Sequence, residues 1–500
     1  MGNSDVKPSI VDKAIYLFSP KAAKDRLKAK QEYKNYVDSG ASITDSALWD
    51  FWPISRSPTE EIDDNRATLG ARTRRLYMSS PIARAAINKY HVNGIGTGLK
   101  AKPNIDIDVL GITKEESAKL EREIKRKFDL YAKSTNCDYS RMFNFYTLQT
   151  LTLITSLVAG DALVVPCYKK RKGVKTRLCL RVIEGDLITS PYAVDTDLIR
   201  NGVEFNTNGE LEAYYVAKRH PGDMYYTTET IRLKAFGDDG NRLVHHIFEP
   251  ERPGQRRGVP LLAPVISALK QHSRYSESEL MAAVIGAMYT VFVTTEANTD
   301  PLKNLGVDKK DNNLPDKTVG MKKGGIVKLN PGEKVEIANP GRPNANYSTF
   351  VDAIITEIGA GIGVPREVLL TSFGSNYSAS KAALDEAWKG FLKKRSLIEM
   401  YMCQPFYEEW LTEQVSLGEI HLPGYMDNDR KRLAYSRAYW VGPSKSSLDP
   451  YKEVRAASER VKMGISNREI EAGSIGNDFE EVSKQLLLEN QQLKGVSNEE

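Results

Sequence analysis

The chain has 500 residues, a formal net charge of +5 at pH 7 and four cysteines. That length is enough for several domains, each with a core that needs no disulfide or metal. The charge excess is too small over this length to indicate nucleic-acid binding by itself, so any such contact must be local. No two cysteines have metal-binding or thioredoxin-like spacing, which argues against zinc and redox chemistry at Cys137, Cys167, Cys179 and Cys403.

The N-terminus lacks the basic start and apolar stretch of a secretory signal. The longest uncharged apolar run, residues 280–293, is shorter than the roughly 18 residues that a membrane span requires. We therefore expect no membrane segment and interpret this run as a buried helix that leads into a strand.

Helix-capping patterns mark the N-terminal third. Ser57-Pro-Thr-Glu60 and Thr113-Lys-Glu-Glu116 are capping boxes, and each predicts the start of a helix. Between them Ser80-Pro81 starts another helix, which the glycines of residues 94–98 end. The first fifty residues are charged and helical in places, and we expect them to form an arm.

Strand patterns follow an apolar helix over residues 144–160. Residues 162–168 and 176–184 are rich in β-branched and aliphatic side chains and flank a basic tip, residues 169–175, which predicts a hairpin. Asn208-Gly209 predicts a second hairpin. The N-terminal half is therefore α+β. The basic tip is consistent either with a solvated turn or with phosphate contact.

A connection rich in proline and glycine, residues 248–260, carries Arg252, Arg256 and Arg257. Its bland interpretation is a solvated basic loop. It leads into a helix predicted from 261 to 287, which at 1.5 Å per residue spans about 40 Å. That length suits a rod better than a compact layer.

The C-terminal half begins with a small module, residues 294–343, in which we expect a strand over 325–329 to pair with one over 334–337. A second helix starts near Ser348, and a loop follows. From residue 379 an amphipathic helix carries one apolar stripe, and Pro405 should kink it. The stripe consists of Leu384, Ala387, Trp388, Phe391, Leu392, Ile398 and Met402.

The last part of the chain reads as a strand over residues 434–441 followed by helices. Ser447-Leu-Asp-Pro450 opens the first of these, and Ser466-Asn-Arg-Glu469 is a further capping box. We expect a disordered tail at residues 497–500.

No catalytic constellation emerges from the residues. The glycine-rich segments 94–98 and 359–363 lack the pattern of a phosphate-binding loop, and His245-His246 has no third metal ligand at useful spacing. We therefore expect no catalytic, cofactor or metal site. The alternative is a metal-dependent nuclease-like enzyme that uses Asp106 and Asp108, placed on a strand.

Short motifs follow one another along the chain. Their order resembles that of the lambda-type family of tailed-phage portal proteins. Each motif alone is weak. The order over several hundred residues is specific, although Lys381 stands where the family usually has an arginine. The motifs include Ala159-Gly-Asp161, Ile183-Glu-Gly-Asp186, Asn201-Gly-Val-Glu204, Arg252-Pro-Gly-Gln-Arg-Arg-Gly-Val-Pro260, Gly361-Ile-Gly-Val-Pro365, Asn376-Tyr-Ser-Ala-Ser-Lys381 and Trp440-Val-Gly-Pro443.

The resemblance implies an α+β fold with the portal architecture of wing, stem, clip and crown, assembled as a ring. It divides the chain into a wing (1–260), a first stem helix (261–293), a clip (294–343), a second stem helix (344–364), a tunnel loop (365–378), a kinked tunnel-lining helix with the return to the wing (379–446), and a crown with a disordered tail (447–500).

The resemblance also implies a function. Twelve copies are expected to form a channel at one capsid vertex for packaging and ejecting double-stranded DNA, in a virion assembled in the host cytoplasm. Partners would be terminase large subunit, head-completion or connector proteins, scaffold and the major capsid protein; a capsid shell protein fits the length but not this order of parts. DNA would meet Gly374, Ser375, Asn376, Tyr377, Ser378 and Lys381, and terminase would dock near Lys322, Lys323, Lys328 and Lys334. Arg252, Arg256 and Arg257 would face another subunit or the channel.

Overall fold

The computed structural model describes residues 9–37, 55–225, 227–287, 291–295, 333–337, 346–373, 377–445, 449–475, 477 and 479–496. The chain divides into two compact units, Met1–Glu61 and Ile62–Glu500. The first contains helices α1 (Ile10–Phe18) and α2 (Pro20–Val37). These two helices confirm the helical content expected near the N-terminus.

Capping side chains begin the helices of the second unit. Thr113 and Glu116 form both halves of the predicted capping box at α6 (Lys114–Lys133). The hydroxyl of Ser80 accepts from the Ala83 amide at α4 (Pro81–Gly94). Near Ser57 a π-helical turn, η2 (Thr59–Asp63), precedes α3 (Asp64–Ser79), and Asn144 caps α7 (Phe145–Ala159).

Antiparallel pairs make up the sheets. Strands β2 (Ala162–Tyr168) and β3 (Leu178–Glu184) form the predicted hairpin around the basic tip, and β8 (His245–Ile247) pairs with the other edge of β2. The second predicted hairpin is confirmed by a four-stranded sheet in sequence order. Its strands are β4 (Ile199–Arg200), β5 (Val203–Phe205), β6 (Leu211–Ala217) and β7 (Thr230–Lys234).

The main hydrophobic core lies among the helices. Phe128 of α6 is wholly buried, and its ring meets five aromatic rings edge-on at centroid distances from 5.0 to 6.5 Å. Such contacts add about 0.5–1.5 kcal/mol each to the stabilisation from buried area. The five rings around Phe128 belong to Phe145, Phe406, Tyr407, Trp410 and Trp440.

A smaller core joins the two sheets and includes Leu163, Ile183, Val203, Tyr214 and Val216.

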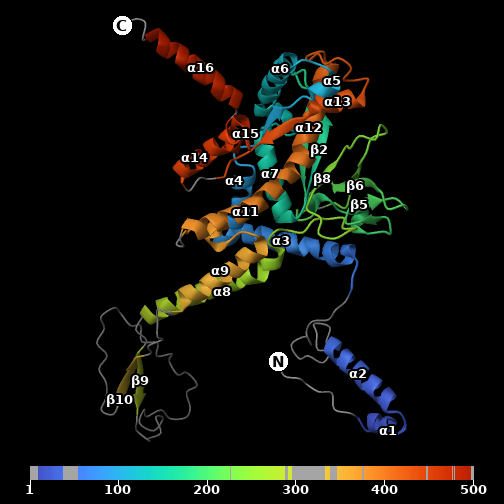
Figure 1. Ribbon diagram of the computed structural model, residues 1–500. Helices are drawn as coiled ribbons and strands as arrows, with labels where there is room; N and C mark the ends of the chain where they lie inside the picture. Colours follow the sequence, from blue (N-terminus) through green and yellow to red (C-terminus); the bar gives the residue numbers. More distant parts are fainter. Residues whose placement is uncertain are drawn as a thin grey trace, which may run out of the picture. The chain divides into compact units, whose positions relative to one another are not determined.

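Two helices form the predicted rod: α8 (Ile266–Ala287) and α9 (Tyr347–Ile362) lie side by side (Figure 1). Tyr275 of α8 stacks on Tyr347 at 5.6 Å and meets Phe350 edge-on at 4.8 Å. The expectation that residues 280–293 start as a buried helix is wrong within this chain. Leu280 and Met281 are more than half exposed, at 67% and 57%. The C-terminal turns of α8 therefore present apolar side chains that no described residue covers.

A π-helical turn lies where the kink was predicted, just before Pro405. The long amphipathic helix consists of α11 (Tyr377–Ile398), a π-helical turn η7 (Glu399–Cys403) and α12 (Gln404–Ser416). Pro405 has no N–H to donate, and the backbone accommodates it by widening the preceding turn. The predicted apolar stripe packs into the core except for Leu392, which is 41% exposed.

Helix α4 fastens the end of α9 and the short helix that follows, α10 (Arg366–Leu370). The hydroxyl of Tyr90 donates to the carbonyl of Ile362 at 2.6 Å, and its ring meets Phe391 of α11 edge-on. Lys89 Nζ donates to Thr371 Oγ1 at 2.8 Å. Thr371 has φ of +55°, a left-handed conformation that ends α10.

Three details differ from the sequence-based expectations. Residues 434–436 belong to helix α13 (Asp429–Ser436), and the strand β11 starts later (Ala438–Val441), where it pairs with β1 (Lys100–Pro103). Asn467, rather than Ser466, caps α15 (Arg468–Ser474). Strand β10 (Glu333–Ile337) pairs with β9 (Val291–Thr295), whereas residues 325–329 lie outside the described residues.

The C-terminal segment contains α14 (Pro450–Lys462), which Asp449 caps, and α16 (Phe479–Val496). The second unit also contains a short helix, α5 (Ile107–Leu110). None of the helices in the described segments is both long and apolar enough to span a bilayer.

Candidate functional site

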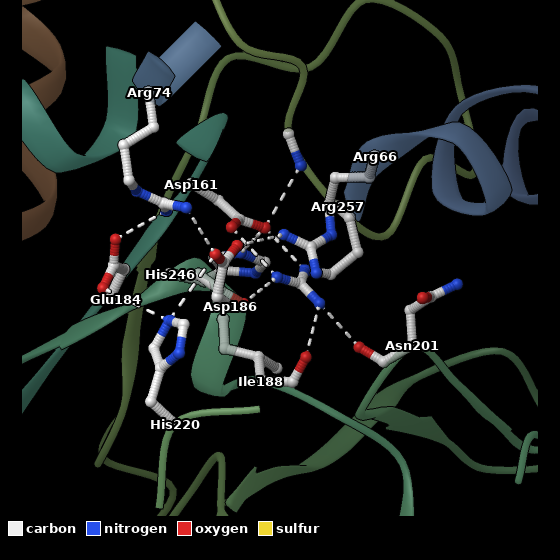
Figure 2. Close-up of polar contacts among 12 residues, drawn as sticks. Arg66, Arg74, Asp161, Glu184, Asp186, Ile188, Asn201, His220, His246 and Arg257 are labelled. Carbon is white, nitrogen blue, oxygen red and sulfur yellow. Dashed lines mark hydrogen bonds and ion pairs between the residues drawn. The ribbon is translucent and has the colours of Figure 1, made fainter. Parts of the chain in front are cut away.

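The most developed polar site is a buried ion network around Arg257 (Figure 2). Arg257 and Asp161 are both 0% exposed. Arg257 Nε donates to Asp161 Oδ2 at 2.5 Å, and Nη2 donates to Asp161 Oδ1 at 3.0 Å, a bidentate pair. The remaining N–H groups donate to the carbonyls of Gly185, Ile188 and Asn201. All five donors of the guanidinium are thus satisfied without water.

Asp161 is held as a carboxylate by its surroundings. Burial alone would raise its pKa, but Arg257 and the hydrogen bond from His246 hold that pKa well below its usual range. Burial lowers the pKa of His246, so its ring is neutral near pH 7. His246 Nε2 lies 3.1 Å from Asp161 Oδ2, and because a carboxylate only accepts, this nitrogen carries the proton.

Two glycines bring the network together. Gly160 has φ of +96°, and a Cβ there would come within 2.5 Å of the Gly258 carbonyl oxygen. A Cβ on Gly258 would in turn meet the Gly160 carbonyl oxygen. The Gly258 amide also donates to Asp161 Oδ2 at 3.3 Å. This close backbone approach is what places Arg257 opposite Asp161.

An outer group of charges extends the network to α3. Arg74 bridges Glu184 at 2.6 Å and Asp186 at 2.9 Å. Burial lowers the pKa of Arg74, but the two carboxylates outweigh it, so this pKa is raised. Arg66 Nη1 lies 3.6 Å from Asp186 Oδ1. Figure 2 shows His220 next to Glu184 and Asp186, with its Nε2 3.7 Å from Asp186 Oδ2.

Asp63, one helical turn before Arg66, is the least satisfied member. It is 2% exposed, and neither carboxylate oxygen has a hydrogen-bond partner among the residues that the structure describes. Burial raises the pKa of Asp63 to about 6 and lowers the pKa of Arg66 to about 10. The network therefore has a paired centre and an unpaired carboxyl at its edge.

Chemically the network is a structural clamp. Its central carboxylate and guanidinium have no exposed surface from which to meet a substrate. It joins α3, the α7–β2 junction, the end of β3, the β4–β5 turn and the connection that leads to α8. The direction in which that connection enters the rod is thereby fixed.

The three arginines of the connection have different environments. Arg257, expected to face another subunit or a channel, is buried, so that expectation is wrong for its side chain in this chain. Arg256 is partly exposed, lies 4.5 Å above the Phe205 ring and donates to the Leu198 carbonyl at 3.2 Å. Arg252 is partly exposed. For Arg252 and Arg256 a contact with another subunit or the channel stays a prediction.

The expected DNA-facing and docking residues are only partly described. Gly374, Ser375 and Asn376 lie outside the described residues, as do Lys322, Lys323 and Lys328. Tyr377 starts α11, Ser378 is exposed and Lys381 is partly exposed. Lys334 lies in β10 opposite Thr294. Their roles stay predictions.

The alternative nuclease pair does not lie on a strand. Asp106 caps α5, accepting from the Val109 amide, and pairs with Arg437 at 2.6 Å. Asp108 is exposed on α5 itself. Across the described ranges, no three His, Cys, Asp or Glu side chains gather as metal ligands.

The basic hairpin tip is partly tied to the chain. Arg171 donates to the Asp138 carbonyl at 2.6 Å, and Lys175 pairs with Glu419 at 2.6 Å. Lys169 lies 3.2 Å above the Tyr139 ring. The tip is thus neither a fully solvated turn nor a set of free cations.

Four of the sequence motifs meet in the buried network. Asp161, Gly185, Asn201 and Arg257 come from separate motifs, and one guanidinium contacts the other three residues. Sequence reasoning recorded these motifs but did not infer their contact. Each of the four motifs has a glycine directly beside a polar or charged residue, and this was the available signal.

A sequence model of the family described as "Phage portal protein, lambda family" matches residues 44–395. The chain belongs to this family. It is 24% identical over 490 residues to the portal protein of Escherichia phage N15, covering 93% of this chain and 92% of that protein. It is 23% identical over 494 residues to portal protein B of Escherichia phage lambda, covering 94% and 92%.

Among solved structures, the neck of an empty gene transfer agent particle computed with C6 symmetry contains a similar chain. The TM-score is 0.44 at 12% identity, over 83% of this chain and 93% of that one. The family assignment rests on the sequence matches, which run through both the network and the rod.

Proposed function

We propose that copies of this portal-family chain assemble into a closed ring, of twelve subunits by family resemblance, through which double-stranded DNA passes into and out of a capsid.

 The observation that carries this proposal is the family match, which covers residues 44–395 and extends in two phage relatives over more than nine-tenths of the chain. A ring of identical subunits needs two different, complementary faces on each copy.

The exposed end of the rod supports assembly. Leu280, Met281 and Val284 of α8 are 67%, 57% and 42% exposed, and Phe350 of α9 is 49% exposed. Apolar side chains gathered on one exposed element commonly mark a protein interface. In a ring, the rods of neighbouring copies would cover these side chains.

The parts of the chain then take the family's roles. Residues 1–260 form the wing, α8 and α9 the stem, residues 294–343 the clip, 365–378 the tunnel loop, 379–446 the kinked helix and the return to the wing, and 447–500 the crown. Terminase docks on the clip, connector proteins complete the head, and scaffold and major capsid protein surround the ring in the virion. The chain itself is a passage and catalyses no reaction.

Assembly provides the test. Purified protein is examined by mass photometry and negative-stain microscopy over a range of salt and protein concentrations. We expect particles of one large, uniform mass with a central hole. Only monomers or dimers under all of these conditions would contradict the proposal.

A further inference from the structure

A groove between α3 and α8 is lined by cations that form no ion pair with the described residues. Its volume is about 490 Å³, and Arg72 and Arg75 of α3 face Lys270 and Arg274 of α8 across it. None of these four side chains makes an ion pair with any described residue, and no carboxylate lines the groove. Four like charges around one hollow repel each other, so the groove favours an anionic occupant.

The groove also has apolar side chains between the cations. Leu76 of α3 is 8% exposed, and Ile266 of α8 is partly buried beside it. A phosphate backbone offers nothing to cover such a floor, and a duplex is too wide to enter a hollow of this volume. A glutamate on a helix fits both parts of the groove: its methylene groups cover the apolar side chains, and its carboxylate pairs with the cations.

The rod itself carries a suitable carboxylate. Glu357 of α9 is exposed, and its side chain has no hydrogen-bond or ion-pair partner among the described residues. The other acidic residue of α9 near this level, Asp352, already pairs with Arg366 at 2.5 Å. Glu357 is therefore the available anion on this helix.

The register of the rod places Glu357 level with the groove. Val265 lies against Gly361, and Tyr275 lies against Tyr347, so α8 and α9 run in opposite directions. Interpolating between these contacts sets Glu357 beside about residue 268, within about 3 Å along the rod of Lys270. With the rods aligned along the ring axis, a rotation about that axis moves no atom along the rod, so groups at one level meet across the interface between copies.

We propose that the α3–α8 groove of each copy receives Glu357 of a neighbouring copy. The inference rests on the proposed ring and names a contact that closes it. Arginine forks at Arg72 and Arg75 suit a carboxylate, and the contact adds to the apolar packing of the rods.

The test uses charge reversal in the full chain. Arg72→Glu with Arg75→Glu, and separately Glu357→Arg, should each raise the protein concentration at half-assembly by about tenfold or more, since each places like charges together. Combining the three substitutions should restore assembly toward the wild-type value. Lys119→Glu and Glu115→Arg, on exposed positions of α6, serve as matched controls and should leave assembly unchanged.

A cross-link gives an independent readout. Gln271→Cys with Glu357→Cys, treated with a short bis-maleimide, should yield a ladder of covalently joined subunits on denaturing gels, and either single cysteine variant should not. Circular dichroism confirms that each variant is folded.

The outcomes separate the two proposals. If the wild-type chain forms no ring, the proposed function fails and this contact with it. If wild-type rings form but the reversals leave assembly unchanged, or the combined variant is not restored, the contact is wrong and the ring stands. If the Arg72→Glu, Arg75→Glu variant forms normal rings but loses binding to a short DNA duplex, the groove is a phosphate site and the inference is overturned.

Discussion

Asp161 and Arg257 form a bidentate ion pair in which both side chains are wholly buried, although 96 residues separate them in the chain. Taking two charges out of water is costly, and the pair is tolerated because every donor of the guanidinium has an acceptor. Loss of one member would leave the other charged and unpaired.

Asp161→Asn should therefore lower the free energy of unfolding by about 3–5 kcal/mol. Glu184→Gln, at the partly exposed edge of the same network, should cost less than about 1 kcal/mol. Urea unfolding followed by circular dichroism measures both. Equal effects of the two substitutions would contradict the distinction between a buried centre and an exposed edge.

Gly160→Ala and Gly258→Ala should each destabilise the chain by more than about 2 kcal/mol, because each added methyl meets the other residue's backbone. Gly473→Ala is the control, since a Cβ there meets nothing within 4 Å. In its helix that change should be neutral or stabilise by up to about 1 kcal/mol. Melting temperatures of the three variants test the argument, which fails if Gly160→Ala behaves like Gly473→Ala.

Asp63→Asn should stabilise the chain at alkaline pH. The pKa of Asp63 is raised to about 6, whereas an unfolded aspartate has a pKa of about 3.9. The folded state thus binds this proton more tightly, so the stability it contributes is present below about pH 4 and is lost as pH rises through 6.

At pH 8 the variant should exceed the wild type in unfolding free energy by about 1–2 kcal/mol, and the difference should shrink toward pH 4. Asp64→Asn, one residue away and exposed, is the matched control and should show no such pH dependence. A wild-type chain that is as stable as Asp63→Asn at pH 8 would show that the carboxyl is not destabilised by burial.

Purified protein should hydrolyse neither ATP nor DNA in the presence of Mg²⁺ or Mn²⁺. The Asp106 carboxylate caps α5 and pairs with Arg437, whereas Asp108 is exposed on the same short helix. Metal-dependent cleavage that survives purification and disappears in Asp106→Ala or Asp108→Ala would overturn the structural role.

Replacing Ser375 and Asn376 with alanine should change the unfolding free energy by no more than about 0.5 kcal/mol, as exposed substitutions usually do. Rings should still form, while packaging or retention of DNA changes, because this segment is proposed to meet the DNA. Unfolding or failed assembly of the double variant would instead make the segment part of the packed structure.

Local signals in the sequence predicted local structure well. The β2–β3 hairpin, the cap at Thr113 and the helix irregularity next to Pro405 each depend on neighbouring residues, so the pattern contained the cause. The start of β11 was misplaced because Tyr435 and its neighbours suit a strand as readily as a helix whose tertiary contacts bury them.

The candidate sites were harder to predict, because they depend on contacts between distant segments. Arg257 lies in a basic, proline-rich connection that reads as a solvated loop, and only the fold brings Asp161 to it. The α3–α8 groove likewise combines two helices almost two hundred positions apart in the chain. Spacing within one segment contains no signal for either.

The attachment of α4 to its neighbours has a mechanical consequence. Tyr90 holds the last turn of α9, Lys89 holds the end of α10, and Phe391 packs α11 against the same helix. A force on either side of residues 374–376 therefore reaches α4 within one or two contacts and spreads into the main core. Strain applied at the ends of α9, α10 or α11 would therefore be shared by the body of the subunit.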